Sequence, residues 1–234
     1  MKKTLLIITA LMLVVGCDPS TEPEPEEETV TDIDGNVYET VQIGDQLWMA
    51  ENLKVTKYNN GGEIPTGYSN EEWVGLITGA YEVYPLNSTG NVSTCEGDCA
   101  EVYGNLYNWF AVDDERGICP EGWHMPSDGE FVVLEEHLGM NVACQLAGNS
   151  DLWLDGYLED HFKFGTSGFT ALPGGFIYSV GIQGLSTNGY FWSSTGSTEG
   201  GAIAVNRSLH YNTTYVTRGN EHGYYGCSIR CLKD

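Results

Sequence analysis

The sequence predicts an α+β fold in which two helices and a looped antiparallel sheet form one disulfide-stapled domain. Three observations support this prediction. Apolar residues recur with helical spacing in the middle of the chain, whereas both ends of the region alternate apolar and polar residues between glycine-rich turns. Six of the seven cysteines also fall in this region. In a chain that leaves the cytoplasm, such a set indicates disulfide bonds.

The first 16 residues are typical of a lipoprotein signal peptide. Lys2 and Lys3 precede a mostly apolar run over residues 5–15, which is too short to span a bilayer as a helix. The run ends in Val-Val-Gly-Cys, which looks like a lipobox with Cys17 as the lipid acceptor. More than one acyl chain on this residue would suffice for stable membrane anchoring. The alternative is an ordinary secretory signal followed by an incidental cysteine.

Residues 17–29 combine the predicted lipidated cysteine with an acidic, proline-rich tether, DPSTEPEPEEE. This segment buries too little apolar area to offset its ordering entropy, so we expect an extended, self-repelling spacer. Acidic residues directly after the cysteine also resemble the export signal of Bacteroidetes-type lipoproteins. That resemblance implies an outer-membrane lipoprotein exposed at the cell surface, and the alternative is a plain solvated spacer.

The remaining chain, residues 30–234, is long enough for a single domain with a sizeable core. From Thr29 onward, 8 Lys and Arg stand against 27 Asp and Glu, which gives a formal charge of −19. A phosphate backbone would be repelled, so nucleic acid is excluded as a partner and bare anionic headgroups are disfavoured.

The domain is expected to open with a β-meander. Residues 30–33 and 37–43 alternate around an Asp-Gly turn, and a Gly-Asp turn leads into a third strand at 47–49. Two helices follow. Four apolar residues share one face of the first helix: Val102, Leu106, Trp109 and Phe110.

The second helix has clear start and stop signals. Ser127 and Glu130 have the spacing of a capping box, and Gly139 is placed to end the helix. Beyond Phe162 the composition favours short strands joined by long loops. The tail over residues 226–232 alternates like a half-buried strand, with its cysteines on one face.

Six short motifs, in one order along the chain, resemble the Fibrobacter succinogenes major paralogous domain. The resemblance covers roughly residues 30–234. It implies a C-type-lectin-like fold, related to that of formylglycine-generating enzymes, in a bacterial surface or secreted module. The motifs are DGNVYETVQIGDQLWMAENL (34–53), YGNLYNWFAV (103–112), CPEGWHMPSDGE (119–130), GFTALPGG (168–175), GYFWSST (189–195) and SIRCLKD (228–234).

With Cys17 assigned to lipid, six cysteines remain, an even set that predicts three disulfides. Cys227 and Cys231, four strand steps apart, would be about 13 Å from each other, which is too far for a bridge. A glycine-containing turn allows Cys95 to pair with Cys99. If that small loop closes, the other four cysteines can pair in either of two ways.

The family resemblance implies one of these two pairings. Cys119 and Cys231 occupy the positions of the family's long-range bridge, which leaves Cys144 for Cys227. A zinc site made from the two Cys-x-x-x-Cys pairs is the rival hypothesis, although structural zinc pairs are usually more closely spaced.

The sequence contains no recognisable catalytic motif. Formylglycine-generating enzymes oxidise substrates with a reactive cysteine pair near the C-terminal end of the fold, and Cys227 and Cys231 invite that comparison. Nothing around these two residues matches the motifs of those enzymes, so we expect no catalytic residues and no enzymatic activity.

Aromatic residues favour a binding function, because six Trp and fourteen Tyr exceed what one core of this size needs. Trp73 lies outside the shared motifs and is the expected exposed contact. The stretch 206–225 has the composition of adaptable binding loops. Its candidate ligand-binding residues are Tyr211, Asn212, Tyr215 and Arg218. The tryptophans inside the motifs are expected to be core residues instead: Trp48, Trp109, Trp123 and Trp192.

Calcium is the one cofactor that the sequence suggests. Asp113, Asp114 and Glu115 follow the predicted Trp109 helix at its negative end, where a bound Ca²⁺ would relieve their repulsion. The alternative is a solvated acidic loop.

Together these features predict a lipid-anchored, non-enzymatic binding or adhesion module of the cell envelope, with an extracellular glycan or protein as its ligand. Two alternatives stay open. One is a structural surface component without a dedicated ligand, and the other is a divergent oxidase of the formylglycine-generating type.

Overall fold

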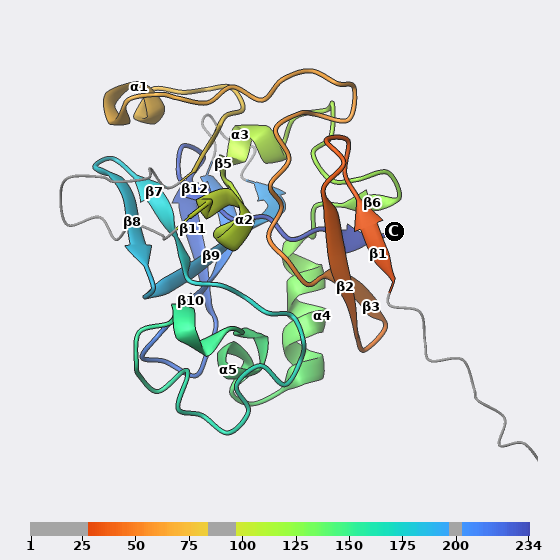
Figure 1. Ribbon diagram of the computed structural model, residues 1–234, viewed down its shortest axis with the longest axis vertical. Coiled ribbons are helices and arrows are strands. Elements are labelled where there is room, and N and C mark those ends of the chain that lie inside the picture. The colour runs from red at the N-terminus through yellow and green to blue at the C-terminus, as the bar shows by residue number, and fades with distance from the viewer. Residues whose placement is uncertain (1–27, 84–96, 197–202) are drawn as a thin grey trace, which may run out of the picture.

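The computed structural model describes residues 28–83, 97–196 and 203–234. These residues form a mixed α+β domain that is mostly sheet, with short helices around two sheets (Figure 1). The predicted signal peptide, Cys17 and most of the tether lie outside the described residues. Among the residues described, no helix has both the length and the apolar composition needed to cross a membrane.

The smaller sheet has five strands in the order β1-β2-β3-β13-β6. Its first three strands form the predicted meander, and the C-terminal strand β13 inserts between β3 and β6, so the two ends of the domain are joined. The strands are β1 (Thr29–Thr31), β2 (Val37–Ile43), β3 (Gln46–Met49), β6 (Trp123–His124) and β13 (Leu232–Lys233).

The larger sheet has the order β11-β10-β9-β7-β12-β5-β4, and β8 pairs with β7. All its strand pairs are antiparallel except β7 with β9. The strands are β4 (Tyr81–Glu82), β5 (Leu106–Asn108), β7 (Gly174–Tyr178), β8 (Gly181–Leu185), β9 (Asn188–Gly196), β10 (Ile203–His210), β11 (Thr217–His222) and β12 (Gly226–Cys227).

The capping box predicted the longest helix correctly. Ser127 accepts a hydrogen bond from the backbone of Glu130, whose carboxylate accepts from the Ser127 backbone, and the helix ends at Gly139. The helical elements are α1 (Asn70–Val74), α2 (Cys99–Tyr103), α3 (Trp109–Val112), α4 (Asp128–Leu138), α5 (Val142–Leu146) and the 3₁₀ turn η1 (Ser150–Leu152).

The single helix predicted from Val102 to Phe110 was wrong. The chain instead forms α2, strand β5 and α3. Gly104 ends α2 with φ of 71°, a conformation that favours glycine. A Cβ at Gly104 would lie 2.8 Å from the carbonyl oxygen of Leu53, so the chain passes the 52–53 segment too closely for any other residue.

Three clusters of buried apolar side chains hold the sheets and helices together. Trp192 and Trp109 lie in the first cluster and Trp48 in the second, while Trp123 is half-buried against the first. The motif tryptophans are therefore core residues, as predicted.

The tail does not form the predicted half-buried strand. Every residue from Gly226 to Leu232 is buried, because β12 lies between β5 and β7 while β13 lies between β3 and β6. The segment thus crosses from one sheet to the other through the interior. It carries Arg230 into the core, where the guanidinium group donates to four oxygens.

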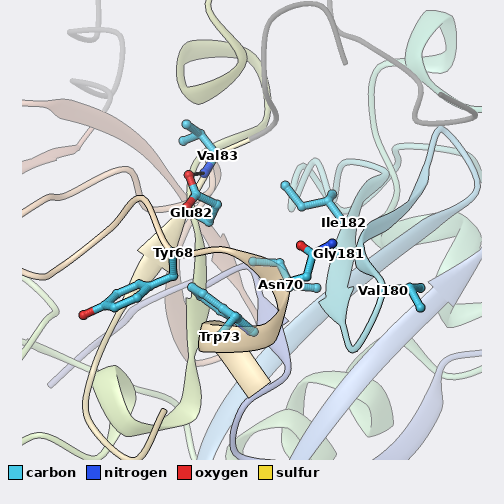
Figure 2. Close-up of a pocket in the computed structure, with 9 residues that line it drawn as sticks. Tyr68, Asn70, Trp73, Glu82, Val83, Val180, Gly181 and Ile182 are labelled. Carbon is cyan, nitrogen blue, oxygen red and sulfur yellow. Dashed lines mark hydrogen bonds between the residues drawn. The ribbon is translucent and has the colours of Figure 1, made fainter. Parts of the chain in front are cut away.

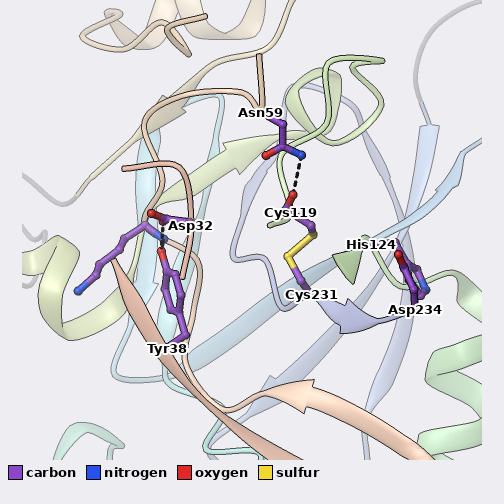
Figure 3. The surroundings of a disulfide bond; sticks show 8 residues. Asp32, Tyr38, Asn59, Cys119, His124, Cys231 and Asp234 are labelled. Atoms are coloured by element: carbon purple, nitrogen blue, oxygen red, sulfur yellow. Dashed lines mark hydrogen bonds and ion pairs between the residues drawn. A yellow bond between two sulfur atoms is a disulfide. The ribbon is translucent and has the colours of Figure 1, made fainter. Parts of the chain in front are cut away.

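The structure joins Cys119 to Cys231, the bridge implied by the family resemblance (Figure 3). The bridge spans 112 residues of sequence, a closure worth about 4 to 5 kcal/mol in the chain-entropy model. The Asn59 side-chain amide donates to the carbonyl oxygen of Cys119 at 2.7 Å and fixes the chain beside the bridge.

The predicted Cys144–Cys227 disulfide is wrong, because both residues are free, buried thiols. Cys144 lies on α5 among the second cluster, whereas Cys227 lies on β12 in the first, so each sulfur packs in a different part of the core. Cys99 is disulfide-bonded, but its predicted partner, Cys95, lies outside the described residues.

Candidate functional site

Aromatic side chains from β7, β9, β11 and the β11–β12 turn form a continuous cluster at the surface. Successive ring centroids lie between 4.6 and 6.3 Å apart, the range of favourable aromatic pairs. We call this cluster the aromatic band. In order of contact it comprises Tyr190, Phe176, Tyr225, Tyr178, Tyr224 and His222.

The band rests on the core but keeps access to solvent. Tyr190 and Tyr225 pack against the first core cluster, while the side chain of Tyr178 is 37% exposed. The local sequence explains this placement, because strand alternation puts Phe176 and Tyr178 on one face of β7 and the buried Ile177 on the other.

The turn that presents Tyr224 and Tyr225 is held from three sides. The backbone N–H of Tyr225 donates to the carbonyl oxygen of His222 at 2.8 Å. The indole N–H of Trp73 donates to the carbonyl oxygen of Tyr224. Directly after the turn, a Cβ at Gly226 would lie 2.6 Å from the Ile177 side chain, so glycine allows β12 its close approach to β7.

Three phenol groups of the band, those of Tyr190, Tyr224 and Tyr225, have raised pKa values and stay protonated at physiological pH. Burial, followed by the charge of Glu221 and the phenol of Tyr178, raises the pKa of Tyr225. Burial also raises the pKa of Tyr224 and of Tyr190, and the carboxylate of Glu221 adds to both shifts. The band therefore presents neutral hydroxyl groups that both donate and accept hydrogen bonds, with one carboxylate beside them.

The prediction that Trp73 is an exposed contact was wrong. Its side chain is 2% exposed and packs in the third core cluster with Ile177 and Leu106. The short helix α1, capped by Ser69 and Glu72, turns the indole inward, so the polar neighbours in sequence gave a false signal of exposure. Trp73 instead supports the backbone of Tyr224.

The other predicted ligand-binding residues are not members of the aromatic band. Tyr211 is half-buried against the second core cluster, and its backbone bonds to Thr187 and Leu158. Asn212 is exposed, and Tyr215 is 64% exposed. Within the described residues, the ring of Tyr215 does not pair with a ring of the band.

Arg218 is exposed but already paired. Its guanidinium group makes a two-pronged ion pair with Asp128, at 2.9 Å from each carboxylate oxygen. The same carboxylate accepts from the buried Arg207, which also bonds Glu135. Alternation along β11 places Arg218 on the opposite face from Glu221.

The acidic run after α3 does not assemble a cation site. Asp114 makes two hydrogen bonds with Arg116, at 2.7 and 2.6 Å. This partner lowers the pKa of the Asp114 carboxyl and neutralises its charge. Within the described ranges, no group of three or more His, Cys, Asp or Glu could hold a metal ion. Asp113 and Glu115 therefore do not converge with Asp114 on a shared point.

Sequence reasoning missed half of the band. Tyr224 and Tyr225 fall at the end of the loop-like stretch 206–225, but Phe176, Tyr178 and Tyr190 were not singled out. A signal was present in the alternation of Gly-Gly-Phe-Ile-Tyr, whose outward positions are both aromatic. Such a strand exposes rings on the face opposite its buried residue.

A comparison with protein-family models finds one match. The model described as Fibrobacter succinogenes major domain matches residues 41–233, which is most of the chain. No curated protein matches the chain, and no solved structure does so.

Proposed function

The chain belongs to the Fibrobacter succinogenes major domain family, and from that premise we propose that it is a non-enzymatic, glycan-binding module of the cell envelope. The aromatic band is the observation that carries this proposal. A partly exposed row of rings with phenol hydroxyls suits a sugar chain, which offers apolar C–H faces and hydroxyl groups together.

Pre-organisation supports the same conclusion. The rings contact one another and rest on core side chains, and the Tyr224 turn is fixed by the Trp73 indole. Little side-chain entropy would be lost when a ligand settles on them, so more of the contact energy would appear as affinity. Tyr178 and His222 also keep ring surface open to solvent, where a ligand can reach it.

The charge of the domain narrows the class of glycan. The domain carries an excess of acids, and Glu221 lies beside the rings. Anionic polysaccharides would meet repulsion, whereas neutral ones would not. We therefore propose a neutral glycan as ligand, in preference to an anionic polymer.

Two features of the cysteines favour a binding role over an oxidase. Cys231 is engaged in the disulfide with Cys119, and burial raises the pKa of the Cys227 thiol well above its usual range. A reactive pair requires an accessible thiolate. The proposal has three further parts, which rest on the sequence alone. They are a C-type-lectin-like architecture, a lipid anchor at Cys17 and exposure at the outer cell surface.

The binding proposal is tested by exposing the purified domain to an array of neutral and anionic glycans. Tyr178→Ala and Tyr224→Ala should each weaken binding to the best neutral ligand by roughly tenfold or more, because contact aromatics contribute disproportionately to affinity. Tyr215→Ala is the matched control, since it removes a tyrosine that is outside the band and even more exposed than Tyr178. Loss of binding in the control alone would move the site to the 211–218 segment, and absence of any glycan ligand would favour the structural alternative.

The anchor is tested separately by cell fractionation. Cys17→Ser should release the protein from the membrane fraction without altering the melting temperature, because the tether separates the lipid from the domain. Unchanged membrane association of the variant would reject lipidation at Cys17 and leave the glycan result unaffected.

A further inference from the structure

A pocket lies on the other side of the β7–β8 hairpin, away from the aromatic band. It lies between α1, β4 and β8 (Figure 2) and has a volume of about 310 Å³, at the lower end of the range for small-ligand sites. Ile177 and Ile182 are paired on β7 and β8, so they share one face. That face is opposite to the one carrying Phe176 and Tyr178.

The walls of the pocket are mainly apolar and aromatic. Tyr68 and Trp73 come from the segment around α1, and Ile177 and Ile182 from the hairpin. Figure 2 shows the side chains of Glu82 and Asn70 entering the same space from different elements. The pocket thus combines an apolar lining with one carboxylate and one amide.

Glu82 is the only charged residue among those that line the pocket. Its carboxylate accepts from the backbone N–H of Gly67 at 3.1 Å and from the Thr66 hydroxyl at 3.5 Å. In the described part of the chain it has no ion-pair partner, and residues 84–96, which follow it, contain no Lys or Arg.

All but one of the Lys and Arg side chains in the described residues are already committed elsewhere. The exception is Lys163, whose loop bonds to α5 through Gly165 and Cys144 and not to the pocket. Lys54, Lys57, Lys233, Arg116, Arg207 and Arg218 each pair with an acid. Arg230 is buried among its own acceptors. A positive partner for Glu82 would therefore come from another molecule, and the acidity of the domain would attract it.

We propose that this pocket binds an alkylammonium group with an apolar stem, as presented by a lysine side chain of a partner protein. The methylene stem would lie along Trp73, Tyr68 and Ile182, and the ammonium would donate to the Glu82 carboxylate and the Asn70 amide oxygen. A lysine suits the site better than an arginine, because a single carboxylate and one amide oxygen leave most of the five guanidinium N–H groups without acceptors.

The probe is Nα-acetyl-lysine N-methylamide, titrated into isotopically labelled domain and followed by chemical-shift changes of Trp73, Glu82 and Ile182. Binding should saturate in wild type and weaken at least tenfold in Glu82→Gln, which keeps the shape of the side chain but removes its charge. Glu71→Gln is the matched control, because Glu71 is an exposed acid on α1 outside the pocket. It should bind like wild type.

Three probes decide the chemistry. The norleucine analogue, which lacks the amine, and the arginine analogue should both bind at least tenfold more weakly than the lysine probe. n-Butylamine tests for a free amine: if it binds and the capped lysine does not, the assignment to a lysine side chain is wrong. Equal binding of the lysine probe to wild type and Glu82→Gln, or no shift changes at these residues, would overturn the proposal.

The proposal does not depend on glycan binding. Tyr178→Ala should leave the affinity for the lysine probe unchanged, because Tyr178 lies on the opposite face of β7.

Discussion

Replacing Arg230 by methionine should destabilise the domain by about 3 to 5 kcal/mol, because it leaves several buried oxygens without their hydrogen-bond donor. The guanidinium group is fully buried. It donates to the Asn52 side chain at 2.7 Å, to the carbonyl oxygen of Met49 at 3.1 Å and to that of Thr170 at 2.7 Å, as well as to the carbonyl oxygen of Phe169. Burial lowers the pKa of Arg230 to about 9, which still leaves the group charged at neutral pH.

The magnitude follows from what methionine would leave behind. Each buried oxygen that loses its donor costs roughly 1 to 3 kcal/mol. The carbonyl of Thr170 is partly exposed and can recover a water, whereas the acceptors at Met49 and Asn52 are enclosed. Removing a desolvated cation offsets part of the loss. Against a typical total stability of about 5 to 15 kcal/mol, the remaining cost is large.

Urea denaturation followed by circular dichroism measures this effect. The matched control is Arg218→Met, which removes an exposed arginine from its pair with Asp128 and should cost under about 1 kcal/mol. Arg230→Lys retains a charge but lacks the fork that reaches four oxygens, so it should fall between wild type and methionine. If Arg230→Met lies within about 1 kcal/mol of wild type, with an unchanged m-value, the inferred role of the buried network is wrong.

Three further predictions concern the core, the C-terminus and the thiols. Trp192→Ala should lower the free energy of unfolding, measured by urea denaturation, by about 3 to 5 kcal/mol, because the ring is fully buried and its N–H donates to the Tyr107 carbonyl. A loss below about 1 kcal/mol would refute this placement of the ring. Burial alone would lower the pKa of His124, but its hydrogen bonds with Glu130 and Asp234 raise it. Protonated His124 should therefore add stability that is complete below about pH 6.5 and is lost as pH rises through the raised pKa. His124→Gln should remove this pH dependence of stability, which is worth under about 1 kcal/mol because the site is so exposed. If the variant shows the same profile of melting temperature against pH as wild type, the assignment of this effect to His124 is wrong. Cys144 and Cys227 should resist alkylation in the folded protein, because both are buried and burial raises the pKa of each thiol. Both should react once the protein is unfolded without reductant. A disulfide-linked peptide that contains both residues would contradict the structure.

Local signals in the sequence predicted those parts of the fold that depend on local causes. The capping box from Ser127 to Glu130 defined α4, because its two hydrogen bonds lie within one turn. The turns at Gly35 and Gly44 defined the opening meander, because both glycines adopt positive φ. The long-range pairing of Cys119 with Cys231 came from the family resemblance and agrees with the structure.

Features that depend on distant segments could not be predicted from local patterns. The alternation of residues 226–232 suggests one solvated face, but the second sheet covers that face and buries Arg230 as well. The predicted pairing of Cys144 with Cys227 depended on the number of cysteines left over. That number carries no information about position, and the two sulfurs lie in different core clusters. Trp73 has acidic neighbours, yet a five-residue helix is enough to turn one side chain inward.

The candidate site follows from the same crossing segment that stabilises the core. Gly226 lets β12 lie against Ile177, and this approach sets Tyr225 within 4.9 Å of Tyr178 and 6.1 Å of Phe176, measured between ring centroids. Beyond the turn, the chain continues through Arg230 to the disulfide-bonded Cys231. The bonds that hold the tail in the interior therefore also fix the positions of the rings relative to one another. A rigid tail is what allows aromatic side chains from three separate strands and one turn to act as a single contact surface, because each ring would otherwise lose conformational freedom on binding.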